Sequence, residues 1–331
     1  MKAMKIVGAA LAVSLIGQAA RADATGERQA AWRAATAERQ AAWRAAIAHT
    51  RTPGPGCYQA AYPLTVWHQV ACTVAPTRAY IPATGTDHGA QTTGDGNDYA
   101  GVTENITLDA KGSFPRAKGL TSETGSGGRP NFYSLQLNSN FMAGNPACAG
   151  SFDASKCLAW LQYVYSSGEH QAFMQYWLIH YAGGSVHCPS GWISVSDDCF
   201  KNSPSVQVPL QPITELPNIS IGGAADLGGF DTLNMTTATQ GYAVSNQDSV
   251  VFLATGWHGS EFNVIGDGGG SSANFNAGTK LAVRIDLNDG TTKKPGCNAN
   301  SGTTGETNNL NLGPCLARGG ATPFVRLTES N

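Results

Sequence analysis

The chain has 331 residues, of which 13% are charged, and its formal net charge is −2. A balance this close to neutral excludes the basic surface that binds nucleic acid, so no DNA or RNA partner is expected. The length allows one large β-domain or two ordinary domains, and the 40 glycines are typical of secreted β-proteins with long polar loops.

The first 22 residues have the pattern of a secretory signal peptide. Lys2 and Lys5 precede an apolar run over residues 6–16. Small residues and then Ala20-Arg21-Ala22 follow, which suits signal-peptidase cleavage before Asp23. The run is too short to span a bilayer as a retained helix, and no later segment approaches about eighteen apolar residues. The sequence therefore predicts a secreted protein, extracellular or periplasmic, without stable membrane insertion. We expect a monomer.

Eight cysteines fall into four neighbouring pairs. Eight cysteines allow about 105 connectivities, and sequential pairing is the simplest because each bond then closes a short loop. Zinc is the competing explanation, but no C-x2-C pair occurs, so no metal site and no cofactor are predicted. The predicted disulfides are Cys57 with Cys72, Cys148 with Cys157, Cys188 with Cys199, and Cys297 with Cys315.

Residues 27–48 contain an eleven-residue repeat, ERQAAWRAATA followed by ERQAAWRAAIA. Eleven residues make three helical turns, so the repeat predicts a helix with Trp32 and Trp43 on nearly the same face. Thr25 is the predicted N-cap, and residues 53–56 (PGPG) end the helix. Residues 23–56 thus form a helical repeat and a linker. Four interpretations of this part stay open: a pro-segment, a spacer, a membrane-surface anchor, and a duplicated tail without a special role.

Residues 57–98 are predicted to form a disulfide-closed segment followed by a polar loop. The segment is expected to pack on the main body as a flap or an extra strand. The remainder, residues 99–331, is rich in short strands separated by Gly, Asn, Asp and Pro. Residues 280–287 alternate clearly between apolar and polar, as in antiparallel sheets with one solvated face. The predicted strands are residues 101–108, 131–141, 159–165, 172–181, 205–208, 219–221, 241–244, 249–254, 261–265, 280–287 and 324–327.

These features predict an all-β fold. We expect an antiparallel two-sheet β-sandwich, jelly-roll or concanavalin-like, over residues 99–331, with a short N-terminal helix before it. Motifs for zinc peptidases, for the G-x-S-x-G elbow and for nucleotide binding do not occur in the sequence. A scattered Ser-His-Asp triad leaves no sequence signature and stays open.

Two segments carry the candidate chemistry. In residues 131–140 one strand face holds Ser134, Gln136 and Asn138, and the simplest interpretation is that this face meets solvent. The two strands that follow add an aromatic platform that bears glutamines. In residues 255–278, Glu261 begins a strand after a tryptophan, which would shield it and raise its pKa. The predicted substrate-binding residues are Trp160, Gln162, Tyr176 and Trp257.

Four stretches occur in a suggestive order: SLQLN at 134–138, AWLQY at 159–163, SEFNV at 260–264 and ANF at 273–275. They resemble the eqolisin-type glutamic peptidases, secreted jelly-roll sandwiches that act in acid. The resemblance implies that Gln136 and Glu261 match the family's catalytic glutamine and glutamate. It also implies a protein substrate, cleaved by water that the glutamate activates while the glutamine supports the oxyanion.

Two other functions stay open. A secreted carbohydrate-binding sandwich would use Trp160, Tyr163, Tyr176, Trp177 and Trp257 as sugar-stacking faces. A glycan-cleaving enzyme with a polysaccharide substrate would pair Glu261 with Glu306 or Glu123 across a groove. The sequence also leaves open whether residues 23–120 are removed as a pro-segment.

Overall fold

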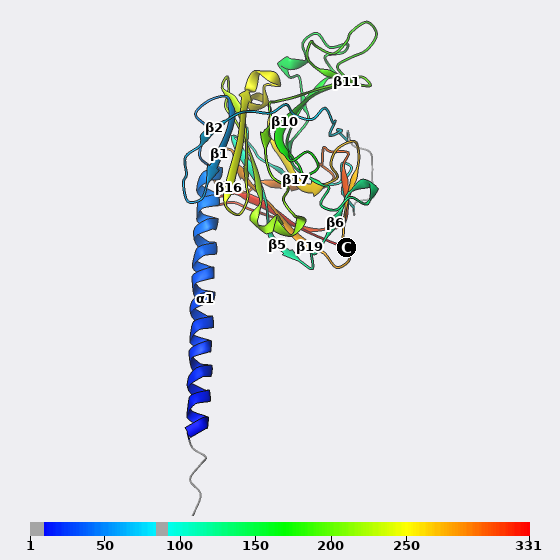
Figure 1. Cartoon of the computed structure of the whole chain (residues 1–331). Helices are drawn as coiled ribbons and strands as arrows, with labels where there is room; N and C mark the ends of the chain where they lie inside the picture. Colours follow the sequence, from blue (N-terminus) through cyan, green and yellow to red (C-terminus); the bar gives the residue numbers. More distant parts are fainter. Residues whose placement is uncertain (1–9, 84–91) are drawn as a thin grey trace, which may run out of the picture.

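The computed structural model describes residues 10–83 and 92–331, and the side chains of the N-terminal helix from residue 28 onward. Two large sheets pack face to face, with a single long helix at the N-terminal side (Figure 1). The prediction of an all-β, two-sheet antiparallel sandwich is confirmed. Residues 1–9, where the predicted signal peptide begins, lie outside the described residues.

The first sheet has twelve strands in the described part of the chain. Its ladders are antiparallel except for one parallel pair, β18 (Ser272–Phe275) with β21 (Thr307–Arg318). β3 (Thr92–Gly94) joins it by pairing with β21. The order of the other strands is β2 (His68–Val70), β1 (Gly56–Ala61), β16 (Gln240–Gln247), β15 (Phe230–Thr236), β14 (Ser220–Ala225), β5 (Asp109–Lys118), β19 (Lys280–Asn288), β22 (Phe324–Ser330), β21 (Thr307–Arg318), β18 (Ser272–Phe275) and β6 (Glu123–Thr124).

The second sheet has ten strands among the described residues and carries the candidate site. β13 (Val206–Gln207) pairs with β10 (Gln171–Ile179), and β8 (Met142–Ala143) pairs with β9 (Leu158–Ser166). The order of the other strands is β11 (Ile193–Val195), β12 (Asp198–Asn202), β10 (Gln171–Ile179), β9 (Leu158–Ser166), β7 (Ser134–Ser139), β17 (Gly259–Ile265), β4 (Ala100–Val102) and β20 (Gly296–Asn298). The connections contain short 3-10 helices at η1 (Ser126–Gly128), η2 (Pro146–Cys148), η3 (Ile213–Asn218), η4 (Asp248–Val250) and η5 (Leu253–Thr255).

The main core lies between the sheets and follows from strand alternation. Leu135 and Leu137 of β7 enter this core, which places Gln136 on the opposite, outer face of the ten-stranded sheet. The predicted alternation of residues 280–287 is confirmed, because every second residue of β19 is buried in the same core. Two glycines allow the sheets to approach closely: Gly112 lies under the Phe262 ring and Gly223 under the Tyr163 ring.

All four predicted disulfides are confirmed. The pairing is sequential, and each bond closes a loop of between 9 and 18 residues. Cys57 and Cys72 join β1 to the residues after β2, while the other three bonds lie within residues 148–315. Four disulfides are typical of an oxidising, extracellular type of environment.

The helix α1 (Ala10–Ala48) is longer than the repeat that predicted it. Its beginning at Ala10 leaves Thr25 inside the helix, so the predicted cap at Thr25 is wrong. Only the C-terminal end contacts the sandwich, and the remainder projects away from it (Figure 1). Among the described residues, no helix has both the length and the apolar character needed to cross a membrane.

Other boundaries also differ from the predictions. Residues 249–254 form η4, η5 and the turn between them, not a strand, and only the start of 101–108 pairs, as β4. The segment that begins at Cys57 adds two strands to the twelve-stranded sheet, β2 at its edge and β1 between β2 and β16. β5, which the sequence analysis missed, lies between β14 and β19. Removal of residues 23–120 would therefore take a central strand out of the sheet.

Candidate functional site

The outer face of the ten-stranded sheet is polar but buried. Ser134, Gln136 and Asn138 follow one another on this face of β7, and each is at most 1% exposed. The interpretation that this row meets solvent is wrong, because two further segments lie over it. One is residues 76–82, which we call the covering segment, and the other is residues 302–306.

Gln136 lies at the centre of a row of side-chain amides. Its Oε1 accepts hydrogen bonds from Gln162 Nε2 at 2.9 Å and from Asn138 Nδ2 at 3.3 Å. Its Nε2 donates to Ser134 Oγ at 3.0 Å and to Glu306 Oε2 at 3.5 Å. These contacts fix the orientation of the carboxamide, so its N–H group is directed toward a glutamate.

Glu261 lies on β17, directly opposite Asn138 in the antiparallel ladder. Asn138 Nδ2 donates to Glu261 Oε2 at 3.3 Å, and the Thr303 main-chain N and Oγ1 donate to the same oxygen at 2.7 and 2.8 Å. The two residues singled out from the sequence, Gln136 and Glu261, are therefore brought to one face and joined through Asn138. Glu261 itself is 2% exposed.

Asp98 is the second carboxyl beside Glu261. Burial, the charge of Glu261 and a hydrogen bond with Glu261 raise the pKa of Asp98 well above its usual range. Oδ2 of Asp98 and Oε1 of Glu261 are both buried, and neither has another hydrogen-bond partner among the described residues. The protonated form of Asp98, which its raised pKa favours, can donate a hydrogen bond to Glu261.

Glu306 is the third acidic group of the site and the one in contact with Gln136. Burial raises the pKa of Glu306 to about 7, although hydrogen bonds from Thr304, Gly270, Ile81 and Gln136 favour its charged form. Oε2 accepts from Thr304 Oγ1 at 2.5 Å, and Oε1 accepts from the Ile81 main-chain N at 3.1 Å. A carboxyl with this pKa holds its proton in acid and exchanges it near neutral pH.

The predicted substrate-binding residues divide between the two faces of the sheet. Gln162 lies on the outer face beside Gln136, and Trp160 lies on the same face, packed with Trp177 and Phe200. Tyr176 and Trp257 belong to the core between the sheets. The Trp257 ring packs against Tyr163 in that core, whereas the Glu261 carboxylate lies on the outer face beside Asn138.

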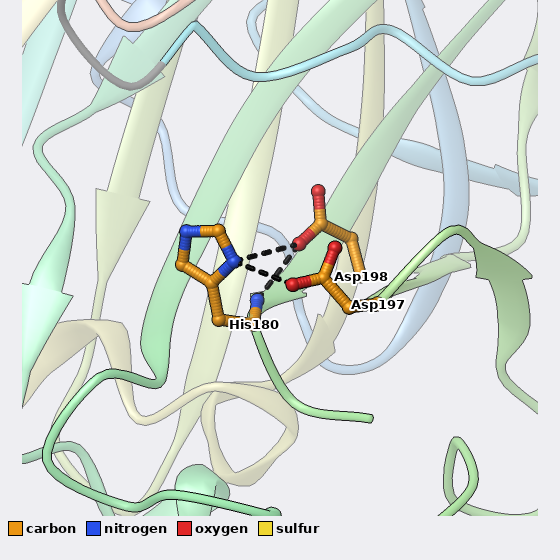
Figure 2. Close-up of side chains that lie close together, drawn as sticks. All are labelled: His180, Asp197 and Asp198. Atoms are coloured by element: carbon orange, nitrogen blue, oxygen red, sulfur yellow. Dashed lines mark hydrogen bonds and ion pairs between the residues drawn. The ribbon is translucent and has the colours of Figure 1, made fainter. Parts of the chain in front are cut away.

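One set of three residues in the described part of the chain has the spacing of a metal site. His180, Asp197 and Asp198 each offer a ligand atom, and these atoms lie within 4.8 Å of one another (Figure 2). The same atoms already form local contacts, since His180 Nδ1 lies 2.7 Å from Asp197 Oδ2, and Asp198 Oδ1 accepts from the His180 main-chain N at 2.7 Å. These bonds account for the cluster as a brace between the end of β10 and the turn before β12.

Sequence reasoning missed Asp98 and named Glu306 only for a glycan-cleaving alternative. It also did not single out Gln175, which bonds to Arg78 and Tyr80 of the covering segment. Asp98 comes from a loop that the sequence marks only as polar, and Glu306 comes from the segment just before β21. Neither position carries a motif. Gln175 had a signal, because on β10 it shares a face with Trp177, which the sequence placed on the aromatic platform.

Comparison with protein-family models, with curated proteins and with solved structures finds no match to this chain.

Proposed function

We propose that the chain is a secreted hydrolase of the glutamic-peptidase type that cleaves proteins at acid pH. The observation that carries this proposal is the position of Gln136, whose amide donates to one buried glutamate and is joined through Asn138 to a second. Four disulfides and the signal-peptide pattern support secretion.

The chemistry needs one carboxyl and one amide. The carboxylate takes a proton from a water, and the water oxygen forms a bond to the carbonyl carbon of the scissile peptide. The Gln136 N–H stabilises the oxyanion that develops. The carboxyl then returns the proton to the leaving nitrogen, and the C–N bond breaks to give an acid and an amine.

Two glutamates are candidates for that carboxyl. Glu261 is the residue that the sequence resemblance implies, and Asp98, whose pKa is raised by burial and by the charge of Glu261, lies beside it. Glu306 contacts Gln136 directly and also accepts a hydrogen bond from a main-chain N–H of the covering segment. We propose Gln136 and Glu261 as the catalytic pair. Glu306 is the competing base only if departure of the covering segment lets water reach it, because its raised pKa results from burial and would then fall.

The buried state of these groups implies a condition for activity. A substrate reaches Gln136 only after the covering segment leaves, so we expect the intact chain to be inactive. The residues before β3 can leave together with the covering segment. Their two strands, β2 and β1, are the outermost pair of the twelve-stranded sheet, and the Cys57–Cys72 disulfide joins only residues of this part to one another. A cleavage before β3 would thus spare the interior strands of both sheets.

The test is digestion of a denatured protein from about pH 3 to pH 7, before and after incubation of the secreted chain in acid. Mass spectrometry records whether the N-terminal part has been lost. Gln136→Ala should lower the rate by about a hundredfold or more, the usual cost of removing one oxyanion donor. Glu261→Gln and Glu306→Gln identify the base, because only the substitution of the true base abolishes cleavage.

Glu104→Gln is the matched control, since Glu104 is an exposed glutamate that pairs with Lys293 and makes no contact with Gln136, Glu261 or Glu306 among the interactions of the described residues. It should digest protein as the parent does. An acid-treated chain that has lost its covering segment, stays folded and digests nothing would refute the peptidase proposal. Glycan binding unchanged by Glu261→Gln would then favour a carbohydrate-binding sandwich, and release of sugar would favour a glycosidase.

A further inference from the structure

The covering segment crosses the strands of the ten-stranded sheet. Its Pro76 carbonyl accepts from Asn202 Nδ2 of β12 at 2.6 Å, and its Ile81 N–H donates to Glu306, which contacts Gln136 of β7. β12 and β7 are three strand spacings apart, roughly 14 Å. Five residue steps of extended chain reach about 17 Å, so the segment crosses in a nearly extended form.

The sheet and two neighbouring loops contact the main chain of this segment. Gln175 makes two such bonds: its Oε1 accepts from the Tyr80 main-chain N at 2.7 Å, and its Nε2 donates to the Arg78 carbonyl at 3.0 Å. The Gly269 and Gly305 N–H groups donate to the carbonyls of Ala79 and Ile81, both at 2.7 Å. Bonds of this kind do not depend on side chains, so they suit an extended peptide of another sequence equally well.

One side chain of the segment fills a pocket. Tyr80 is fully buried against Val164 and Phe173, and its ring centroid lies 5.9 Å from that of Phe173. Its hydroxyl donates to Asp267 Oδ1 at 2.7 Å. Two residues earlier, the Arg78 guanidinium donates to the Asp267 carbonyl at 2.7 Å and pairs with Glu169 at 3.3 Å. The pocket thus fits an aromatic ring with a polar tip, and its rim fits a cation.

We propose that the outer face of the ten-stranded sheet is a peptide-binding groove, and that the covering segment is its built-in occupant. The ligand is an extended polypeptide with a tyrosine in the pocket of Tyr80 and a basic residue two positions before it. The inference deepens the proposed function by naming the substrate class of the same site. In the intact chain, the covalent connection gives the segment a high effective concentration, which excludes free peptides.

The test uses the full chain with Tyr80→Ala, which empties the pocket, together with Glu261→Gln to exclude cleavage. The probe is a fluorescent peptide with the sequence of residues 74–83, and fluorescence anisotropy at pH 7 measures its binding. We expect the Tyr80→Ala chain to bind this peptide at least tenfold more tightly than the same peptide with alanine in place of tyrosine. A chain that retains Tyr80 should bind neither.

The peptide should also raise the thermal unfolding midpoint of the Tyr80→Ala chain, because a ligand that binds only the folded state stabilises it. A folded Tyr80→Ala chain, with four disulfides by mass, that binds neither peptide or both equally would overturn the proposal. If that variant does not fold, Tyr80→Phe keeps the ring and loses only the bond to Asp267. We then expect the Tyr80→Phe chain to bind the tyrosine peptide more tightly than the chain that retains Tyr80 does. Binding no tighter than that of the chain with Tyr80 would overturn the proposal.

This measurement is independent of catalysis. A chain that binds the tyrosine peptide selectively but never digests protein would uphold the groove and refute the peptidase. Digestion of protein by an acid-treated chain, without selective binding of the tyrosine peptide, would uphold the peptidase and overturn the inference.

Discussion

Trp32 and Trp43 occupy the same position in the two copies of the eleven-residue repeat, but their surroundings differ. Trp32 is 67% exposed, whereas Trp43 is 5% exposed. The Trp43 ring packs edge-on against Tyr62, and its Nε1 donates to the Leu64 carbonyl at 2.7 Å. Helical periodicity predicts that the two rings share a face, but only contact with the sandwich decides which of them is buried.

We therefore predict that Trp43→Ala lowers the free energy of unfolding by about 3 kcal/mol, the usual loss for a buried aromatic side chain. Trp32→Ala should change it by less than about 0.5 kcal/mol, as for other exposed positions. Urea unfolding followed by circular dichroism measures both. Equal losses from the two substitutions would show that the helix is stabilised by something other than docking of its second repeat.

At the scale of single residues, the sequence identified Gln136 and Glu261 as candidate site residues because both lie in strands. Gln136 and Glu261 lie within strands, and strand alternation places polar residues on one face without knowledge of the fold. Asp98 and Glu306 reach that face from connections between strands. Their positions depend on long-range pairing, such as that of Pro82 with Thr304, which no local pattern encodes.

At the scale of the element, the missed strand β5 shows what obscures a strand in sequence. Residues 113–116 of β5 face residues 282–284 of β19 across a register shift, so two residues of β5 lie opposite one of β19. Pro115 lies at this bulge, one of the few positions in a sheet that tolerates proline. Gly112 interrupts the apolar alternation because the Phe262 ring occupies its place in the core. Gly112 and Pro115 thus break the alternating pattern of β5, and each has a structural reason: the ring of the facing sheet for Gly112 and the bulge opposite β19 for Pro115.

A pair of adjacent glycines in β14 tests the close approach of the sheets. A Cβ at Gly223 would overlap the Tyr163 ring, whereas a Cβ at Gly222 would have its nearest neighbour at 3.5 Å, an ordinary contact. We predict that Gly223→Ala lowers the free energy of unfolding by roughly 1–3 kcal/mol through overpacking. Gly222→Ala, the matched control, should have little effect. Chemical denaturation compares them, and equal stabilities would contradict this account of the inter-sheet spacing.

At the scale of the whole molecule, buried carboxyl groups make stability depend on pH in an unusual direction. Burial raises the pKa of Glu123, Glu306 and Glu329 from 4.5 to about 7. Between pH 4.5 and 7 the folded chain therefore holds protons that the unfolded chain has released. The free energy of unfolding must then fall as pH rises through this window. For Glu306 alone, the shift corresponds to roughly 3 kcal/mol.

We accordingly predict a higher thermal unfolding midpoint at pH 4.5 than at pH 8, with most of the fall between about pH 4.5 and 7. Differential scanning calorimetry at fixed ionic strength measures it. Glu306→Gln should flatten the fall, because an amide at this position has no proton to release, whereas the exposed Glu104→Gln should leave it unchanged. A midpoint that rises from pH 5 to pH 8 would mean that these carboxyls are ionised in the folded chain. Greatest stability in acid is the property that a hydrolase acting at acid pH requires, so this measurement connects the buried charges of the sandwich with the proposed function.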